Sequence, residues 1–583
     1  MSSDESDEFE GFSQGEIDEA EARYQHQLLQ QGLGDDTDSD GFIESDDSDI
    51  EINDDIPGPA GDAGNVLQNG WHEQFIYHER GMPHLFTPSG ISGPTRIMPQ
   101  DQDPTDFLKL FLTDMLIENL INEADRYAVK QKEQHPNQNK MAWVKPTVPE
   151  MNAFLGLCFQ MGVDRKPSTK MYWSTDHFLH TPVFPNTMSR DRFTQIMRYL
   201  HFSNSELEPL PGAENYDPLF KVKPLVNHFN ACFNQEYNPK RNVTVDECMI
   251  PFKGRVQFRQ YMPAKPHKWG VKVWMLAESQ SSYIKFIDIY PGRRATPQLH
   301  LASNVVKRCL QGAQLEGKGY HVYTDNFFSS PELFEDLFQN YGTAACGTVR
   351  INRRGLPVDI ICKRPEGINQ RGDMKFRQKG CLVASAWKDK KVVNVLSTIH
   401  DNSTSEVQRL VNTEGTFSRQ NFVCPKMVSD YTSNMGGVDR ADQYIQYYCY
   451  NHKTIKWSKR VFFVLLEMAK LNAFKLFIMS HNHPSSMTFL DFTLDIAKGL
   501  VAGYSSDVRR GRPSQVPLEN RLVQRHMPTR FDKKSKCHLC YMRTKNGIQE
   551  TVRQTKFGCN DCRKHLCLPE CFTKFHTVRN CYN

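Results

Sequence analysis

Four acids occupy the positions in this sequence that are best suited to metal chemistry. Asp246 closes the β-rich run 242–247, and Asp325 closes a second run of the same kind. Asp439 follows a glycine pair and opens a helical pattern, and Asp442 lies three residues later on the same helix face. Because carboxylates are hard oxygen ligands, acids gathered by the fold predict a Mg²⁺ or Mn²⁺ site for phosphodiester chemistry. Taken singly, each acid is more typical of a turn or a helix cap.

The order of these acidic segments resembles the piggyBac family of DNA transposases. The matching segments are Thr244–Glu247, Thr324–Ser329 and Asn434–Asp439, within a likeness that extends from about Asp103 to His576. The resemblance implies an RNase H-like DDD nuclease core of the α/β or α+β class. In such a core Asp246, Asp325 and Asp439 hold the catalytic Mg²⁺ or Mn²⁺, and Asp442 supports them.

The resemblance also implies an activity on double-stranded DNA. The core nicks a transposon end with water, the freed 3′-OH attacks the opposite strand to form a hairpin, and after opening the same 3′-OH attacks a TTAA target. A homodimer that works in the nucleus is expected. The alternative is a domesticated, sequence-specific DNA-binding or chromatin protein that keeps the fold without transposing. Terminal inverted repeats bounded by TTAA in the flanking genome would favour the enzyme.

Basic and aromatic residues near the predicted core are candidate DNA contacts. Arg350 and Arg353 follow the strand predicted after Asp325, and guanidinium groups bind phosphates in a bidentate manner. The family resemblance places both near DNA. Lys456 precedes Trp457, an aromatic residue flanked by bases that suits stacking or wedging beside a target step. A helix-anchoring core tryptophan is an equally good interpretation of Trp457.

Charge is divided very unevenly along the chain. Residues 1–60 contain twenty acids and one base, a net charge of −19, so the remainder of this +3 chain carries +22. The basic remainder favours a polyanion partner such as DNA, and the acidic segment is expected to bind this basic surface or host factors. Arg510 and Arg512 belong to an Arg-Gly-Arg-Pro run typical of an A·T minor-groove hook or a nuclear-import signal, although chance explains so short a motif equally well.

The C-terminal cysteine spacing is the strongest local signal. Paired Cys-x₂-Cys knuckles with later Cys and His are typical of tetrahedral Zn²⁺. Seven ligands are one short of two sites, so either Cys581 or His565 is expected to be the eighth. A disulfide framework and a RING-like ubiquitin module are less favoured, the first because residues 2–10 are polar and acidic rather than a secretion signal. The seven are Cys537, Cys540, Cys559, Cys562, Cys567, Cys571 and His576.

These patterns predict the following organisation. Residues 1–102 are acidic and then Gly/Pro-rich, which predicts disorder. The apolar helix expected over Val461–Ser480 contains three charged residues and is interpreted as a core helix rather than a membrane span. The predicted parts are a helical dimerisation and DNA-binding domain (103–241 and 445–504), a catalytic core (242–350 and 412–444), an inserted β-rich segment (351–411), a basic linker (505–532) and a zinc-binding module (533–583).

Overall fold

A computed structural model describes most of the chain. The described residues are 70–98, 102–135, 142–210, 212–263, 265, 267–292, 301–413, 416–451, 453–480, 487–502, 504, 526–578 and 581–582. They divide into two compact units, one within Met1–Pro167 and Asp191–Tyr504, the other within Ser168–Arg190 and Ser505–Asn583. The acidic segment 1–60 and the pair Arg510 and Arg512 lie outside the described residues.

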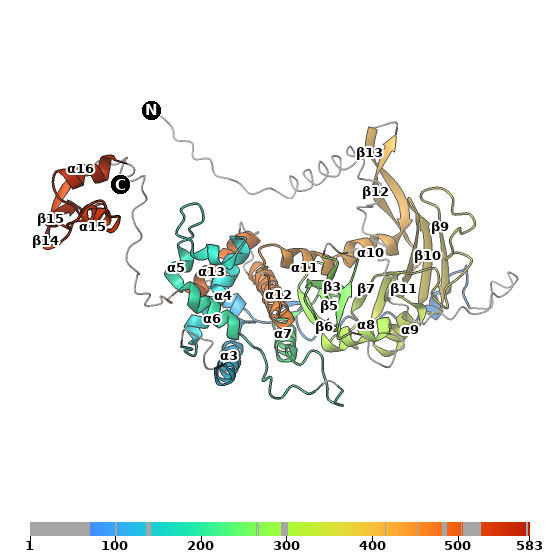
Figure 1. Cartoon of the computed structure of the whole chain (residues 1–583). Coiled ribbons are helices and arrows are strands. Elements are labelled where there is room, and N and C mark those ends of the chain that lie inside the picture. The colour runs from blue at the N-terminus through green and yellow to red at the C-terminus, as the bar shows by residue number, and fades with distance from the viewer. Residues whose placement is uncertain are drawn as a thin grey trace. The chain divides into compact units, whose positions relative to one another are not determined.

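The first unit is built on a nine-stranded mixed sheet (Figure 1). The strand order is β4-β5-β3-β7-β8-β11-β10-β9, with β6 also paired to β5. The pairs β3–β7 and β7–β8 are parallel, and the remaining pairs are antiparallel. The strands are β3 (Asn242–Pro251), β4 (Arg259–Tyr261), β5 (Trp269–Glu278), β6 (Ile284–Ile289), β7 (His321–Thr324), β8 (Ala344–Thr348), β9 (Met374–Lys379), β10 (Leu382–Lys388) and β11 (Val392–Ser397).

Helices cover both faces of this sheet, which explains why β3 is buried along almost its whole length. On one face α8 (Leu301–Gly312) and α9 (Pro331–Asn340) contribute to an apolar core with Val243, Val245 and Leu276. On the other face α10 (Lys426–Met435) contributes Met427, Val428 and Tyr431 to a second core. Figure 1 shows α8 and α9 on the opposite side of the sheet from α10 and α11 (Gly437–Gln446).

The segment 351–411, expected to be an inserted β-rich segment, contains β9, β10 and β11, which extend the core sheet. Strand β11 pairs with β8, and β10 and β9 follow outward. The expected boundary at residue 411 falls inside β12 (Thr404–Thr413), which pairs only with β13 (Thr416–Pro425) in a separate hairpin. The sequence predicts a β-rich segment here, but the pairing of its strands with β8 joins distant segments and is not a local property.

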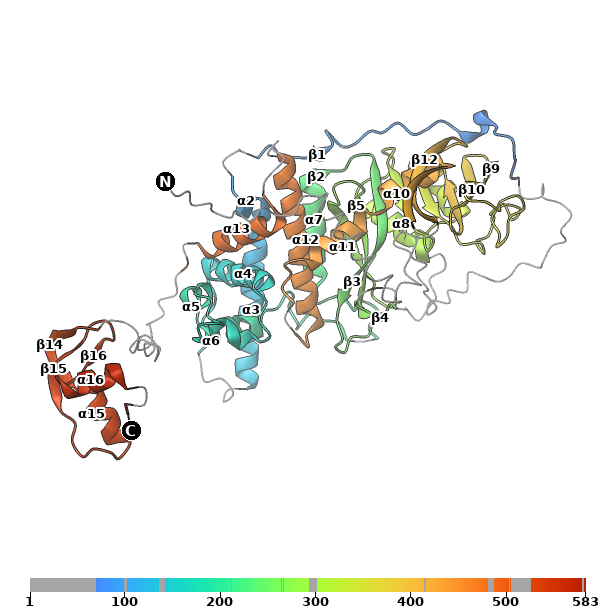
Figure 2. The same cartoon turned by 90° about the horizontal axis from the view of Figure 1, so that it is seen from above.

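Residues 70–98 contradict the prediction that the whole of 1–102 is disordered. The Trp71 side chain is buried in the sheet core, and its Nε1 donates to the Gly355 carbonyl at 2.8 Å. His72 forms a bridge with Gln378 of β9, and β1 (Gly93–Pro94) pairs with β2 (Tyr237–Asn238). Figure 2 shows this segment running along the sheet from β9 to β1. The prediction of disorder used the average hydrophobicity of the segment, which does not reveal single buried residues such as Trp71.

A helical layer completes the first unit. Asp103 begins α2 with a capping box, as the sequence predicts. Helix α13 packs on α4 and α2, and α12 packs on α2 and α7. Within the described ranges, no helix is long and apolar enough to cross a membrane. The helices are α2 (Pro104–Lys109), α3 (Asp114–Gln134), α4 (Val148–Val163), α6 (Arg190–Tyr199), α7 (Lys223–Glu236), α12 (Trp457–Ser480) and α13 (Phe489–Val501).

The second unit contains the cysteine-rich module. Its three-stranded antiparallel sheet has the order β14-β15-β16. Cysteines supply much of its small core, together with Leu539, Leu566, Phe572 and Phe575. The module's elements are β14 (Pro528–Lys536), α15 (His538–Lys545), β15 (Gln554–Cys559), β16 (Lys564–His565) and α16 (Glu570–Thr577); the unit also includes η3 (Thr169–Trp173) and α5 (Val183–Thr187).

Candidate metal centres

The parallel pairing of β3 with β7 brings the first two acids side by side. Val245 lies opposite Thr324 in the register, and each strand continues directly into an aspartate. Asp246 is 8% exposed, and its Oδ1 accepts the Glu247 backbone N–H at 2.8 Å. Asp325 leaves the end of β7, where its Oδ1 accepts the Phe327 backbone N–H at 3.1 Å. Asp246 therefore lies within β3, which continues to Pro251, rather than at the strand end that the sequence predicts. The two carboxylates come together where the parallel pairing of β3 with β7 stops.

Helix α11 brings the third acid to the same strand. The Thr244 hydroxyl donates to the Asn434 carbonyl at 2.7 Å, which fixes the end of α10 on β3. A Cβ at Gly437 would lie 3.0 Å from the Glu278 carbonyl oxygen, a tight contact, so the glycine lets the start of α11 lie close against the sheet. Asp439 follows in the first turn of α11 and is solvent-exposed.

Asp442 reaches the sheet as well, through a thiol. Cys248 is two residues after Asp246 and therefore on the same face of β3. Its Sγ donates to Asp442 Oδ1 at 3.3 Å. Asp442 is thus next to the acid cluster rather than a freely solvated surface acid.

The electrostatics confirm that these acids influence one another. Burial raises the pKa of Asp246 well above its ordinary value, and the carboxylates of Glu247, Asp325 and Asp439 raise it further. Burial, followed by the charge of Glu247, raises the pKa of Asp325 to about 7. Oxygen donors that repel one another are the set that a hard divalent cation stabilises. The residues therefore fit Mg²⁺ or Mn²⁺.

The acid cluster is looser than a closed metal site. Among the described residues, groups of His, Cys, Asp and Glu whose ligand atoms all lie within 4.8 Å occur in the cysteine-rich module and do not include the three aspartates.

Glu247 lies on the opposite face of β3 from Asp246, as the sequence alternation predicts. Its carboxylate pairs with Lys272 of β5 at 3.9 Å, and both side chains are buried. The Lys272 ammonium also lies over the Trp274 ring, 4.1 Å from its centroid. Glu247 is thus not one of the converging ligands, but its charge raises the pKa of both Asp246 and Asp325.

Arg350 and Arg353 lie against the turn that follows Asp325. Arg350 Nε donates to Asn326 Oδ1 at 3.2 Å, and Arg353 Nη2 donates to the Phe327 carbonyl. The Arg350 Nη2 atom is buried and has no hydrogen-bond partner within the described part of the chain. Both guanidinium groups therefore hold the turn after Asp325, Arg350 through the Asn326 side chain and Arg353 through the backbone. Contact of either with DNA stays a prediction.

Trp457 begins α12 beside the far end of β3. Its ring is partly buried and meets Phe258 edge to face, with centroids 5.1 Å apart. Arg460 Nε donates to the Pro251 carbonyl at 3.1 Å, which ties this helix start to β3. Lys456 lies over the Tyr127 ring, 5.0 Å from its centroid. Trp457 thus combines a packing role with some exposure, and DNA contact by Lys456 and Trp457 stays a prediction.

The cysteine-rich module brings its ligands together in two groups of four. Cys537, Cys540, Cys567 and Cys571 form the first, and His526, Cys559, Cys562 and His576 form the second. One group is Cys₄ and the other is Cys₂His₂, and both ligand sets are suited to tetrahedral Zn²⁺. The sulfur atoms of Cys540 and Cys571 are 3.6 Å apart, far beyond the length of a disulfide bond.

The eighth ligand corrects the sequence prediction, which offered Cys581 or His565. Cys581 is fully buried in the module core, and His565 Nδ1 lies 3.1 Å from the Thr555 carbonyl. The residue in the ligand position is His526, whose Nδ1 is 3.4 Å from Cys559 Sγ. Pro528 of β14 pairs with Cys559 of β15, so the residues just before β14 reach the knuckle. The module therefore begins before residue 533, and one of its grouped ligands precedes the first cysteine in the chain.

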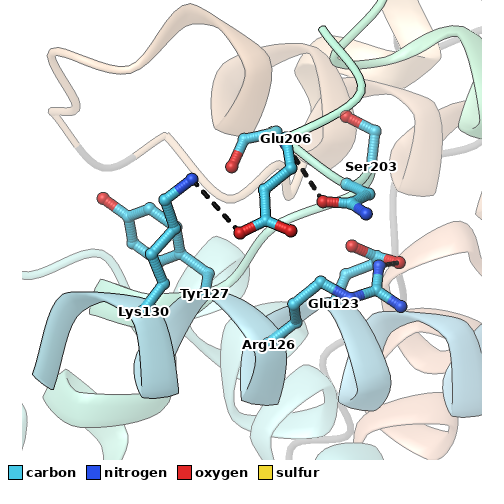
Figure 3. Close-up of a pocket in the computed structure, with 8 residues that line it drawn as sticks. Glu123, Arg126, Tyr127, Lys130, Ser203 and Glu206 are labelled. Atoms are coloured by element: carbon cyan, nitrogen blue, oxygen red, sulfur yellow. Dashed lines mark hydrogen bonds and ion pairs between the residues drawn. The ribbon is translucent and has the colours of Figure 1, made fainter. Parts of the chain in front are cut away.

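A small surface pocket lies between α3 and residues 203–206 (Figure 3). Lys130 Nζ and Glu206 Oε1 are 3.5 Å apart, and Arg126 pairs with Glu123. Because its charged side chains pair with one another, the pocket has no evident need for a charged ligand, and we assign it no function.

Comparisons with known proteins agree with this architecture. A family model described as Transposase IS4 matches residues 103–474. Human piggyBac transposable element-derived protein 3 is 27% identical over 514 residues, 84% of this chain and 79% of that protein. Human piggyBac transposable element-derived protein 5 is 26% identical over 68% of this chain and 75% of its own length.

A solved structure shows the same fold. It is the cryo-EM structure of a piggyBac transposase synaptic complex with hairpin DNA, with a TM-score of 0.63 and 24% identity. The alignment covers 82% of this chain and 98% of that one. The mixed α/β fold and the matched family model define a transposase, a class of nuclease and strand-transfer enzymes. The chain belongs to the piggyBac transposase family.

Proposed function

We propose that this chain is a cut-and-paste DNA transposase that cleaves and joins strands with Mg²⁺ or Mn²⁺ at Asp246, Asp325 and Asp439. The observation that supports this most strongly is the delivery of three acids to one place by two adjacent parallel strands and a docked helix. None of the three has an arginine or lysine partner among the salt bridges of the described residues. For Asp246, which is 8% exposed, this is unusual, because a buried structural acid is normally paired.

The bound ions would activate the attacking oxygen and stabilise the leaving oxygen of the phosphodiester. The chain's own residues prepare for this. Asp246 and Asp325 hold the ions from the sheet, Asp439 closes the site from its solvent side, and Asp442 supports it through Cys248. Arg350, with its unpartnered donor, is placed to bind an incoming phosphate.

The remaining parts suit DNA handling. Two zinc ions would stabilise the cysteine-rich module, whose β14 presents exposed basic residues suited to the transposon end. Lys456 and Trp457 would meet target DNA, and Arg510 and Arg512 would follow a minor groove. By family resemblance, the proposed reaction includes a hairpin intermediate and a TTAA target, in a nuclear homodimer. The RNase H-like assignment of the core has the same basis.

The test is excision in cells. A marker is flanked by the terminal repeats that border this coding sequence in its genome, and repair to TTAA is scored. Wild-type protein is expected to excise the marker, and Asp246→Asn is expected to abolish excision at equal protein level. No excision by the wild-type chain would reject an active transposase.

A domesticated DNA-binding protein is the second candidate. It is favoured by the human relatives, which are named as transposable element-derived proteins. This candidate expects sequence-specific DNA binding that is unaffected by Asp246→Asn, together with no excision by the wild-type chain.

A further inference from the structure

After Val245, one edge of β3 has no neighbouring strand, and a lysine side chain binds the backbone there. Parallel pairing with β7 stops at Val245 and Thr324, so the next residues of β3 have no strand beside them on that edge. Both polar backbone groups of Glu247 are bound by side chains instead. Its N–H donates to Asp246 Oδ1 at 2.8 Å, and its carbonyl accepts from Lys265 Nζ at 3.2 Å.

Lys265 belongs to the segment between β4 and β5, and its side chain is partly buried. Burial opposes its charge, but the nearby carboxylates of Asp246, Glu247 and Asp439 outweigh it and hold the pKa of Lys265 above its ordinary value. The ammonium therefore stays charged, and its hydrogen bond to the Glu247 carbonyl holds it next to Asp246 in the chain. A second lysine, Lys272, pairs with Glu247 on the opposite face of β3, and its charge acts to lower the pKa of Asp325.

We propose that Lys265 is a catalytic residue that alternates between the acids and the scissile phosphate. The inference rests on the proposed strand-cleavage function. In DNA-free protein its ammonium neutralises the acids, and it leaves them when divalent ions bind. A lysine suits this exchange because its flexible four-carbon stem carries a compact charge and three donors. In the DNA-free protein, the hydrogen bond from Lys265 Nζ to the Glu247 carbonyl keeps the ammonium close to Asp246.

In the reaction, the oxygen of water or of a 3′-OH forms a bond to phosphorus while the bond from phosphorus to the leaving 3′-oxygen breaks. The nucleophile loses its proton to solvent, and the leaving oxygen gains one from solvent. Lys265 exchanges no proton. It donates hydrogen bonds to the non-bridging phosphate oxygens, where charge increases in the transition state.

The first arm of the test measures Mn²⁺ binding to full-length, DNA-free protein by electron paramagnetic resonance. Lys265→Met removes a cation that competes for the same carboxylates, so Mn²⁺ affinity is expected to rise at least about tenfold. Lys265→Arg retains the charge and should stay near wild type. Lys268→Met, which removes an exposed lysine of the same segment, is the matched control and should not change affinity. Equal affinity in wild type and Lys265→Met would overturn the proposal.

The second arm measures single-turnover nicking of transposon-end DNA at saturating DNA and Mn²⁺. Lys265→Met should lower the rate about 100-fold, as loss of one transition-state donor does, with Lys265→Arg in between. Lys268→Met should stay within about threefold. Wild-type nicking by Lys265→Met, or an equal loss in Lys268→Met, would refute a catalytic lysine. If the wild-type chain does not nick, the proposed function fails, and the Mn²⁺ arm still decides whether Lys265 competes for the acids.

Discussion

Removing one of the clustered acids should stabilise the protein when no divalent ion fills the site. Burial and the charge of Glu247 raise the pKa of Asp325 to about 7, whereas in the unfolded chain it would titrate near an ordinary pKa of about 3.9. The folded state therefore holds a proton that the unfolded state releases. Its stability falls as pH rises from about 4 to about 7, and the full cost applies above pH 7.

The size of this cost follows from the two pKa values. A difference of about 3 corresponds to about 4 kcal/mol, and solvent screening of the partly exposed Asp325 side chain reduces this to about 1–3 kcal/mol. Asp325→Asn keeps an oxygen that can accept the Phe327 N–H and removes the charge. The variant should therefore melt above wild type at pH 8, with the difference disappearing near pH 4.

The assay is thermal melting from pH 4 to pH 8 in buffer free of Mg²⁺ and Mn²⁺ and without chelator, so that metals in the cysteine-rich module are retained. Asp336→Asn is the control, because Lys307 binds Asp336 at 2.6 Å and outweighs burial to lower the pKa of Asp336. That variant should not gain stability at pH 8. Added Mn²⁺ should reverse the order for residue 325, since only wild type keeps the full ligand set. A wild-type protein that melts above Asp325→Asn at pH 8 without Mn²⁺ would refute the reasoning.

Three further predictions concern the zinc ligands of the cysteine-rich module and the residues that position the acid cluster. His526→Ala should lose one of two zinc ions per chain by metal analysis, while His565→Ala and Cys581→Ser keep both; two ions in His526→Ala would contradict the grouping. Arg353→Ala should lower excision and reintegration together because its guanidinium holds the turn after Asp325, whereas Arg350→Ala should lower reintegration more; a paired assay separates them. Thr244→Val leaves the Asn434 carbonyl unpaired, and should cost about 1–3 kcal/mol in denaturant unfolding and weaken Mn²⁺ binding; unchanged unfolding would dismiss this link.

Local patterns in the sequence predicted the elements that carry the acids. Alternating apolar residues ending in Asp246 and Asp325 indicated strand ends, and the glycine pair before Asp439 indicated a helix start. The structure places Asp325 directly after β7 and Asp439 in the first turn of α11, as those local rules predict, but β3 continues past Asp246 to Pro251, so the prediction that Asp246 ends its strand is wrong. Their convergence was not a local property, and it followed only from the resemblance of the whole ordered set to a known family.

What the sequence could not predict depends on contacts between distant residues. His526 becomes a ligand only because β14 pairs with β15 and brings it beside Cys559. Trp71 is ordered because its indole fits the sheet core and reaches Gly355. Lys265 sits in an irregular segment with no motif, and its position beside Glu247 depends on β7 ending early.

The most direct test of the account is a change of metal preference. Asp246→Cys and Asp325→Cys replace a hard oxygen ligand with a thiolate, which Mg²⁺ binds poorly and Mn²⁺ tolerates better. In a purified nicking assay on transposon-end DNA, both variants are expected to be inactive with Mg²⁺ and to recover measurable nicking with Mn²⁺. Asp246→Ala and Asp325→Ala, which offer no ligand, should stay inactive with either ion. Nicking by the cysteine variants at the wild-type rate with Mg²⁺ would contradict metal ligation by these acids.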